Sequence, residues 1–218
     1  MCSYSFIRLL KEKDALVELL PCAAKHSHPM AVAEKVPVYY GDVVISKSQS
    51  EKIKKFDDLR GHTWAYNDSE SLSGNIQVLK QLKSMGENAS FFGHIVETGS
   101  HIKSLEMILN STVDGACIDS NVLASYLMKN PSMKDKLHVI ASLGPLPAYP
   151  VVINKNLPES LKVALRDALQ RMHEDETGGP HLRRHGVSGF VPTDISLYDF
   201  ETKIRQESSG LRIGTAYY

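Results

Sequence analysis

The chain has 218 residues, of which 42% are hydrophobic and 23% are charged, a composition ordinary for a globular protein. Its 25 basic and 25 acidic side chains cancel, which argues against a nucleic-acid partner and against a basic patch for an anionic membrane. Any anion that the protein binds must therefore be held locally, by a few well-placed hydrogen-bond donors.

The predicted elements of the first half alternate between strand and helix. Gly61 closes a short helical turn, and Gly86 ends an amphipathic helix. In chain order we expect strands at 16–20 and 38–45, a helical turn at 57–61, a strand at 62–66, a helix at 71–85 and a strand at 91–97.

The second half continues the same alternation. Ser100 is the predicted N-cap of a helix, and Pro158 is well placed at the start of a long one. We expect a strand at 114–119, a helix at 121–129, strands at 137–141 and 151–153 on either side of the proline-rich stretch 144–150, a helix at 159–175, and two C-terminal helices near 181–185 and 198–206.

Strands that alternate with helices predict an α/β fold with a mostly parallel sheet covered on both faces. Residues 63–140 form a self-contained run of strands and helices, bracketed by segments that can build a second lobe. The predicted organisation is an outer lobe from 1–54 and 146–218, an inner lobe at 55–145, and a hinge near 47–56 and 143–150.

The segment at 64–74 is the most informative, because a strand ends there and Ser71 and Ser73 open a helix. The first turn of a helix has unpaired N–H groups and the positive end of the helix dipole. Two hydroxyls and the close approach allowed by Gly74 would complete a cradle for phosphate, phosphonate or carboxylate. Plain N-capping by serine explains the same residues, and the sequence leaves both interpretations open.

Two further strand ends carry polar residues that would meet at the same sheet edge. Ser100 and His101 begin a second helix, where the histidine could donate a hydrogen bond to a bound anion. Asp119 follows a third strand and could hold an ammonium group, although N-capping of the next helix explains it at least as well. Tyr40 lies where the other lobe would face the cleft, or it is simply packing.

Catalytic motifs are missing, so we assign no catalytic residue. Cys2, Cys22 and Cys117 are far apart, have no metal-ligand spacing, and read as reduced structural thiols. We therefore expect no metal site and no cofactor. No secretion signal and no run approaching the ~18 apolar residues of a membrane span is present, so the sequence as it stands predicts a cytoplasmic protein without membrane insertion.

The chain resembles the phosphonate-binding (PhnD-like) substrate-binding proteins of ABC transporters. The resemblance runs in order through nearly the whole chain, and the combination is more specific than any one piece. It rests on YYGDVVI (39–45), FDDLRG (56–61), WAYND (64–68), SLSG (71–74), GSH (99–101), DGA (114–116), DS (119–120), LGP (143–145), GV (186–187) and FVP (190–192).

The resemblance implies a periplasmic-binding-protein type II fold whose two lobes close on a small phosphonate or phosphate ester. In that family the serine-rich helix start binds the phosphonate oxygens, which corresponds to Ser71 and Ser73. The histidine of the Gly-Ser-His turn corresponds to His101 and a cleft tyrosine to Tyr40. An acidic residue binds the ligand's amine, for which Asp119 is the best candidate. The family also implies a periplasmic location and a transporter partner.

Two departures from the family pattern affect this expectation. The family begins with a βαβ segment that supplies strands of the outer lobe, and this chain starts after it. Leu72 occupies the middle position of the usual serine/threonine run, which removes one donor. Two rival functions follow: an enzyme acting on a small phosphorylated or amino compound, or an interaction module that has lost ligand binding.

Overall fold

The computed structural model describes residues 3–30 and 36–211. Its internal contacts divide the chain into two compact units, and the chain passes between them after residues 39, 144 and 202. Unit 1 lies within Met1–Tyr39 and Pro145–Thr202, and unit 2 within Tyr40–Gly144 and Lys203–Tyr218.

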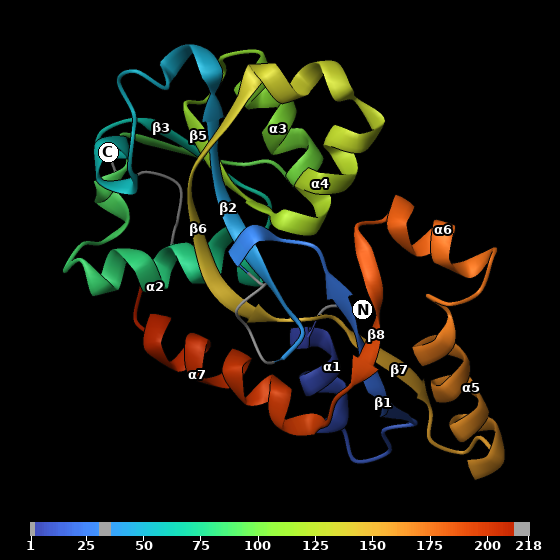
Figure 1. The fold of residues 1–218 in the computed structure, drawn as a ribbon. Coiled ribbons are helices and arrows are strands. Elements are labelled where there is room, and N and C mark those ends of the chain that lie inside the picture. Colours follow the sequence, from blue (N-terminus) through green and yellow to red (C-terminus); the bar gives the residue numbers. More distant parts are fainter. Residues whose placement is uncertain (1–2, 31–35, 212–218) are drawn as a thin grey trace. The chain divides into compact units, whose positions relative to one another are not determined.

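Unit 1 is built on a three-stranded sheet in the order β7-β1-β8 (Figure 1). The central strand β1 runs antiparallel to both of its neighbours. Its register places Leu19 opposite Val152 and Ala24 opposite Phe190. The strands are β1 (Val17–His26), β7 (Pro150–Asn154) and β8 (Val187–Pro192).

Helices of unit 1 pack on this sheet and enclose a small core. α1 lies against β1 and β7, whereas α5 and α6 lie against β8. Phe6 meets Tyr198 edge to face, with ring centroids 5.4 Å apart, and both side chains are buried. The helices are α1 (Ser3–Leu10), α5 (Glu159–Arg171), α6 (Gly178–Arg184) and the 3₁₀ helix η7 (Ile195–Tyr198).

Unit 2 contains a five-stranded sheet in the order β4-β3-β5-β2-β6. β3 runs parallel to β4 and β5, and β2 runs antiparallel to β5. β2 and β6 each cross the boundary between the units near one of their ends. The strands are β2 (Val38–Ser46), β3 (Thr63–Tyr66), β4 (His94–Glu97), β5 (Gly115–Asp119) and β6 (Leu137–Pro147).

The helices of unit 2 follow the strand ends. The α-helices are α2 (Gln77–Ser84), α3 (His101–Leu109), α4 (Ser120–Lys129) and α7 (Asp199–Ser208), of which α7 begins in unit 1 and ends in unit 2. A π-helical turn, η4 (Leu72–Ile76), precedes α2 directly. Short 3₁₀ helices are η2 (Lys47–Gln49), η3 (Phe56–Leu59), η5 (Ala89–Phe91) and η6 (Pro131–Lys136).

Two groups of apolar side chains hold unit 2 together. α3 and α4 pack on β5, where Leu105, Ile108, Ile118 and Leu123 belong to one buried cluster. Elsewhere the Trp64 ring stacks on Phe92 with centroids 4.6 Å apart, as part of an aromatic group that includes Phe56 and Phe91. These cores fix the ends of β3 and β5, from which the candidate site is built.

The α/β type II fold predicted from the sequence is confirmed, but one detail of it needs correction. The pairings of β1 are antiparallel, and the sheet of unit 2 is mixed, so the sheets are not mostly parallel. The reason is that alternation along the chain reports which elements exist and not the direction in which distant strands pair.

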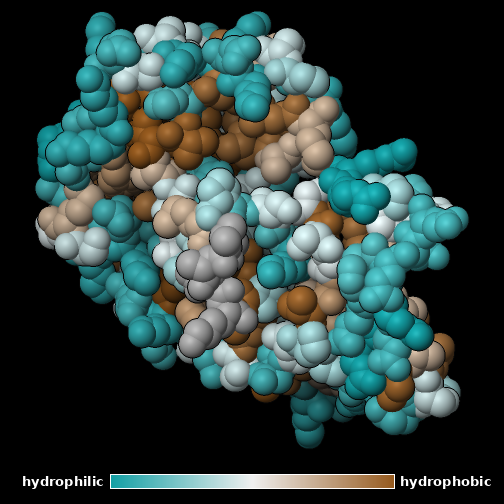
Figure 2. All heavy atoms as spheres, in the orientation of Figure 1, coloured by the Kyte–Doolittle hydropathy of each residue, from teal (hydrophilic) through white to brown (hydrophobic). Residues whose placement is uncertain are grey.

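Hydrophilic side chains cover most of the face drawn in Figure 2. Hydrophobic side chains gather on it over the part of unit 2 where Figure 1 places β3, β5 and α3. Among the described residues, every helix is too short or too polar to cross a membrane.

Candidate functional site

Ser71 begins the helical segment that follows β3, as the sequence predicts. Its Oγ accepts a hydrogen bond of 3.2 Å from the Gly74 N–H, which makes it the N-cap of η4. Its carbonyl accepts from the N–H groups of Asn75 and Ile76. The cap uses a lone pair of the hydroxyl and not its proton, so Ser71 can still donate to an anion. Ser73, two residues on, is buried.

His101 opens α3 directly after its N-cap, Ser100. The Ser100 Oγ accepts from the Lys103 N–H at 3.2 Å, so this side chain caps the helix as predicted. The Nδ1 atom of His101 is buried and has no hydrogen-bond partner. Burial lowers the pKa of His101 to about 4, although a hydrogen bond to the Cys117 backbone and the charge of Asp68 favour the protonated ring.

Gly74 is the point at which the two helix starts meet. A Cβ at this position would overlap Oδ1 of Asn67 and lie 2.9 Å from Cε1 of His101. Only glycine leaves room there, so the backbone of η4, the turn after β3 and the start of α3 come within contact distance of one another. Asn67 Oδ1 is itself buried without a partner.

Tyr40 and Asp119 lie together on the neighbouring strands β2 and β5. The Tyr40 N–H donates to Ser120 Oγ at 3.1 Å, and Asp119 pairs with Gly41 across the antiparallel ladder. A Cβ on Gly41 would lie 2.9 Å from the Ser73 carbonyl oxygen, which places this pair of strands beside η4.

Asp119 acts as the N-cap of α4. Its Oδ1 accepts from the N–H groups of Asn121 at 2.8 Å and Val122 at 3.3 Å. This is the alternative role that the sequence left open. Asp119 and Tyr40 are both buried.

All six residues singled out from the sequence therefore lie in unit 2. Ser71, Ser73 and His101 come together at Gly74, and Tyr40 and Asp119 reach the same region through Gly41. Asn67 was missed, although its place at the end of a predicted strand would have drawn attention to it.

Carboxylates dominate the charges near this region. Asp42 accepts a hydrogen bond of 2.6 Å from Ser142 Oγ on β6. Burial raises the pKa of the Cys117 thiol well above its usual range, and the charges of Asp42 and Asp119 raise it further. A thiol held protonated in this way is a poor nucleophile. Because the nearby carboxylates do not attract an anion, an anion bound here must be held by hydrogen-bond donors that point at it.

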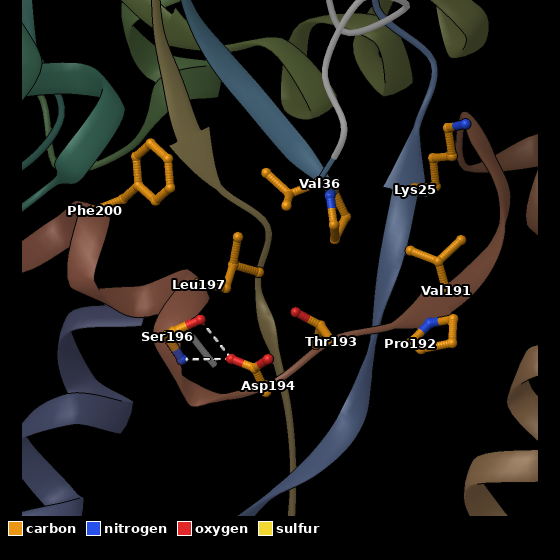
Figure 3. A pocket seen from close by; sticks show the side chains of 10 residues that line it. Lys25, Val36, Val191, Pro192, Thr193, Asp194, Ser196, Leu197 and Phe200 are labelled. Atoms are coloured by element: carbon orange, nitrogen blue, oxygen red, sulfur yellow. Dashed lines mark hydrogen bonds between the residues drawn. The ribbon is translucent and has the colours of Figure 1, made fainter.

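Two hollows are lined by other residues, although the one in unit 2 borders the segment that carries Ser71 and Ser73. One of about 440 Å³ in unit 2 is lined by residues that include Glu70, Asn75 and Arg205. One of about 420 Å³ in unit 1 is mostly apolar, and Figure 3 shows Val36, Leu197 and Phe200 around it. The Asp194 side chain there accepts from the Ser196 N–H and hydroxyl, and Figure 3 shows the Lys25 ammonium directed away from the other side chains. This second hollow therefore offers an anion little.

A comparison with family sequence models matches residues 19–198 to the family described as ABC transporter, phosphonate, periplasmic substrate-binding protein. The match spans most of the chain and includes every residue of the candidate site.

Solved structures share the fold at low sequence identity. A binding protein component of an ABC phosphonate transporter from Pseudomonas aeruginosa is 17% identical, with a TM-score of 0.75 over 95% of this chain and 67% of that one. PhnD1 from Prochlorococcus marinus, solved in complex with methylphosphonate, is 13% identical, with a TM-score of 0.69 over 95% and 83%. The GluR0 ligand-binding core from Nostoc punctiforme, in complex with L-glutamate, is 15% identical, with a TM-score of 0.50 over 84% and 78%.

Proposed function

The chain belongs to the family of periplasmic substrate-binding proteins of phosphonate ABC transporters, and from this premise we propose that it binds a small phosphonate or phosphate ester without converting it. The observation that carries the proposal is the convergence of two helix starts at Gly74, one with Ser71 and Ser73 and the other with His101. The high pKa of Cys117, the one thiol near the site among the residues that the structure describes, supports binding without covalent chemistry.

The proposed anion lies at the start of the η4–α2 segment, which is 13 residues long from Leu72 to Ser84. The Ser71 hydroxyl and the N–H groups of the first turn donate to its oxygens, and the positive end of the helix dipole adds to the attraction. Ser73 lines the same turn, and Ser100 brings the start of α3 to the anion from the other side.

The organic part of the ligand is proposed to extend towards Tyr40 and Asp119. A carboxylate that caps a helix through Oδ1 still has lone pairs with which to accept from an ammonium group. An aminoalkylphosphonate would therefore suit this arrangement of two helix starts and several carboxylates better than a ligand without a positive charge.

Unit 2 is proposed to act as the inner lobe of the two-lobed fold, and unit 1 as the outer lobe. The family implies that the lobes close on the ligand by hinge motion and that a transporter recognises the closed form. Both statements are proposals for this chain, and each depends on ligand binding.

Thermal unfolding in the presence of phosphate, 2-aminoethylphosphonate, methylphosphonate, phosphoserine and sulfate tests the proposal. A ligand at ~100 times its dissociation constant adds roughly 2.7 kcal/mol to native-state stability, which is a visible shift in melting temperature. The shift should vanish in Ser71→Ala/Ser73→Ala. It should persist in Ser84→Ala, because that hydroxyl bonds to the Gln81 carbonyl at the far end of the same helix.

No shift with any anion, in protein that melts cooperatively, would overturn the proposal and favour an interaction module without a ligand. A shift that survives in the double variant would place the anion elsewhere.

A further inference from the structure

Two acceptor atoms beside Gly74 are left without partners. Among the described residues, the buried side-chain atoms that make no hydrogen bond include His101 Nδ1 and Asn67 Oδ1. Both side chains approach the same position, the site of the missing Cβ of Gly74. Buried polar atoms are normally paired, and these two come from different segments and face the same glycine, so a single donor placed there could complete both.

The hydrogen bond of His101 to the Cys117 backbone decides what the ring offers to that partner. The ring donates this bond, because the bond favours the protonated form. Since Nδ1 has no partner, the N–H of the neutral ring is on Nε2 and Nδ1 presents a lone pair. A neutral His101 therefore accepts a hydrogen bond at Nδ1 and cannot donate one there.

The groups around the ring keep it in this state above pH 5. Burial lowers the His101 pKa to about 4, and Asp68, in the turn after β3, is the charge that acts on it. Behind the ring, β5 contributes Cys117, whose thiol stays protonated beside Asp42 of β2 and Asp119. The side chains of η4 have no titratable group. Lys103, a cation in the same first turn of α3, forms an ion pair with Glu106 at 3.4 Å.

A fully deprotonated oxyanion fits poorly beside His101 Nδ1 and Asn67 Oδ1. Its oxygens are acceptors only, and they would face two further acceptors with no proton between them. An anion that carries one P–OH group supplies the missing proton and leaves its other oxygens for the donors of the η4 helix start.

We propose that the complex holds one proton between a ligand oxygen and His101 Nδ1, with Asn67 Oδ1 as the second acceptor. The site would then select phosphonates and phosphates that carry one P–OH group over sulfate, which is fully deprotonated. This inference rests on the proposed function and assigns to the same site a preference for one protonation state. A monoanion brings the proton with it, whereas a dianion binds only with uptake of one proton from solvent.

Calorimetric titration with methylphosphonate and with sulfate measures this directly. Above the second pKa of the ligand, the dissociation constant for methylphosphonate should rise tenfold per pH unit, because the binding form becomes a tenth as abundant. At the same pH, titrations in two buffers with different heats of ionisation should count one proton taken up per ligand. Sulfate should bind at least a hundredfold more weakly than methylphosphonate at pH 6.

His101→Gln separates this role from general support of the site. The glutamine amide can turn its NH₂ donors towards a dianion, so proton uptake should vanish and the preference over sulfate should shrink. The matched control is His26→Gln, because His26 lies in unit 1 with both ring nitrogens buried and unpartnered and with its pKa likewise lowered to about 4 by burial. That variant should leave both readouts unchanged.

The wild-type protein alone decides the proposal if the variant fails to fold. Binding of methylphosphonate at pH 8 without proton uptake, or equal affinity for sulfate, overturns the proton-sharing site and leaves the proposed function standing. No binding of any anion at any pH overturns both.

Discussion

Asp114 and Thr63 tie the start of β5 to the start of β3 within unit 2. The Thr63 N–H and hydroxyl both donate to Asp114 Oδ2, at 2.8 and 2.7 Å, and the Asp114 N–H donates back to Thr63 Oγ1 at 2.9 Å. Gln49 adds a bond of 2.8 Å to the other carboxylate oxygen. Both strands lead directly to the candidate site, so this pair supports the position of the site from the opposite end of the sheet.

Asp114→Asn should therefore destabilise the protein by about 2 kcal/mol at pH 7. Burial raises the Asp114 pKa, but the hydrogen bonds from Thr63, Gln49 and His62 outweigh it and lower the pKa to about 2. A depressed pKa stabilises the folded state above the unfolded pKa of about 4, and that stability is lost as the pH falls towards 2.

Urea unfolding at pH 7, 5 and 3.5 checks this. The gap between wild type and variant should be largest at pH 7 and 5 and smaller at pH 3.5. Asp135→Asn, at an exposed position, is the control and should change little. A gap that does not depend on pH would contradict the assigned role.

Ser71→Asp should separate helix capping from anion binding. Aspartate is as good an N-cap as serine and is favoured by the helix dipole, so the melting temperature without ligand should be kept. Its charge should repel the ligand and abolish the anion-induced shift. Ser71→Ala should instead lose about 1 kcal/mol of stability along with affinity. Undiminished anion binding by Ser71→Asp would place the anion away from this helix start.

Gly74→Ala should destabilise the protein and abolish anion binding. The new methyl group would displace Asn67 and press on His101. Adding Asn67→Ala removes the worse of the two overlaps, so the double variant should recover part of the stability lost by the single one. Chemical denaturation of the four proteins of this cycle gives the coupling. Strict additivity would show that the two residues do not meet in solution.

Cys117 should resist alkylation in the folded protein. Burial raises its thiol pKa, so little thiolate is present at pH 8 and reagents cannot reach it. Cys22, also buried and with a raised pKa, should behave in the same way. The third thiol, Cys2, lies outside the described residues. Iodoacetamide labelling followed by peptide mass spectrometry should find both buried cysteines modified only after unfolding, and rapid labelling of native Cys117 would revive the enzymatic alternative.

Local signals predicted unit 2 best. Ser100 caps a helix as expected, Ser71 and Asp119 cap helices as one of the two interpretations left open for each, and Gly61 and Gly86 end elements with positive φ. These features depend on a few neighbouring residues, which is why a single sequence reveals them.

Elements that depend on distant partners were harder to predict. The predicted strand at 137–141 ends six residues before β6 does, because Pro145 and Pro147 were interpreted as the end of the strand. β6 lies at the edge of its sheet, and edge strands tolerate proline. The strand β8 and the helix α1 were missed altogether. β8 pairs with β1 across more than 150 residues, and no local pattern reports such a pairing.

The same limit applies to the candidate site. Residue types and strand ends suggested Ser71, Ser73 and His101, but the contact of Asn67 with Gly74 and the unpartnered Nδ1 of His101 depend on tertiary packing. The sequence therefore indicated a place for an anion, and only the packing suggests which protonation state of that anion the place prefers.

The last turns of α7 close over the segment that carries Ser71. Arg205 donates to the Glu70 carboxylate and carbonyl, Lys80 pairs with Glu207, and Lys83 donates to the Ser209 carbonyl. During synthesis on the ribosome, residues 40–144 emerge well before these partners do. The segment that carries Ser71 therefore lacks these partners until the chain has been made past Ser209, so these contacts are among the last of unit 2 to form.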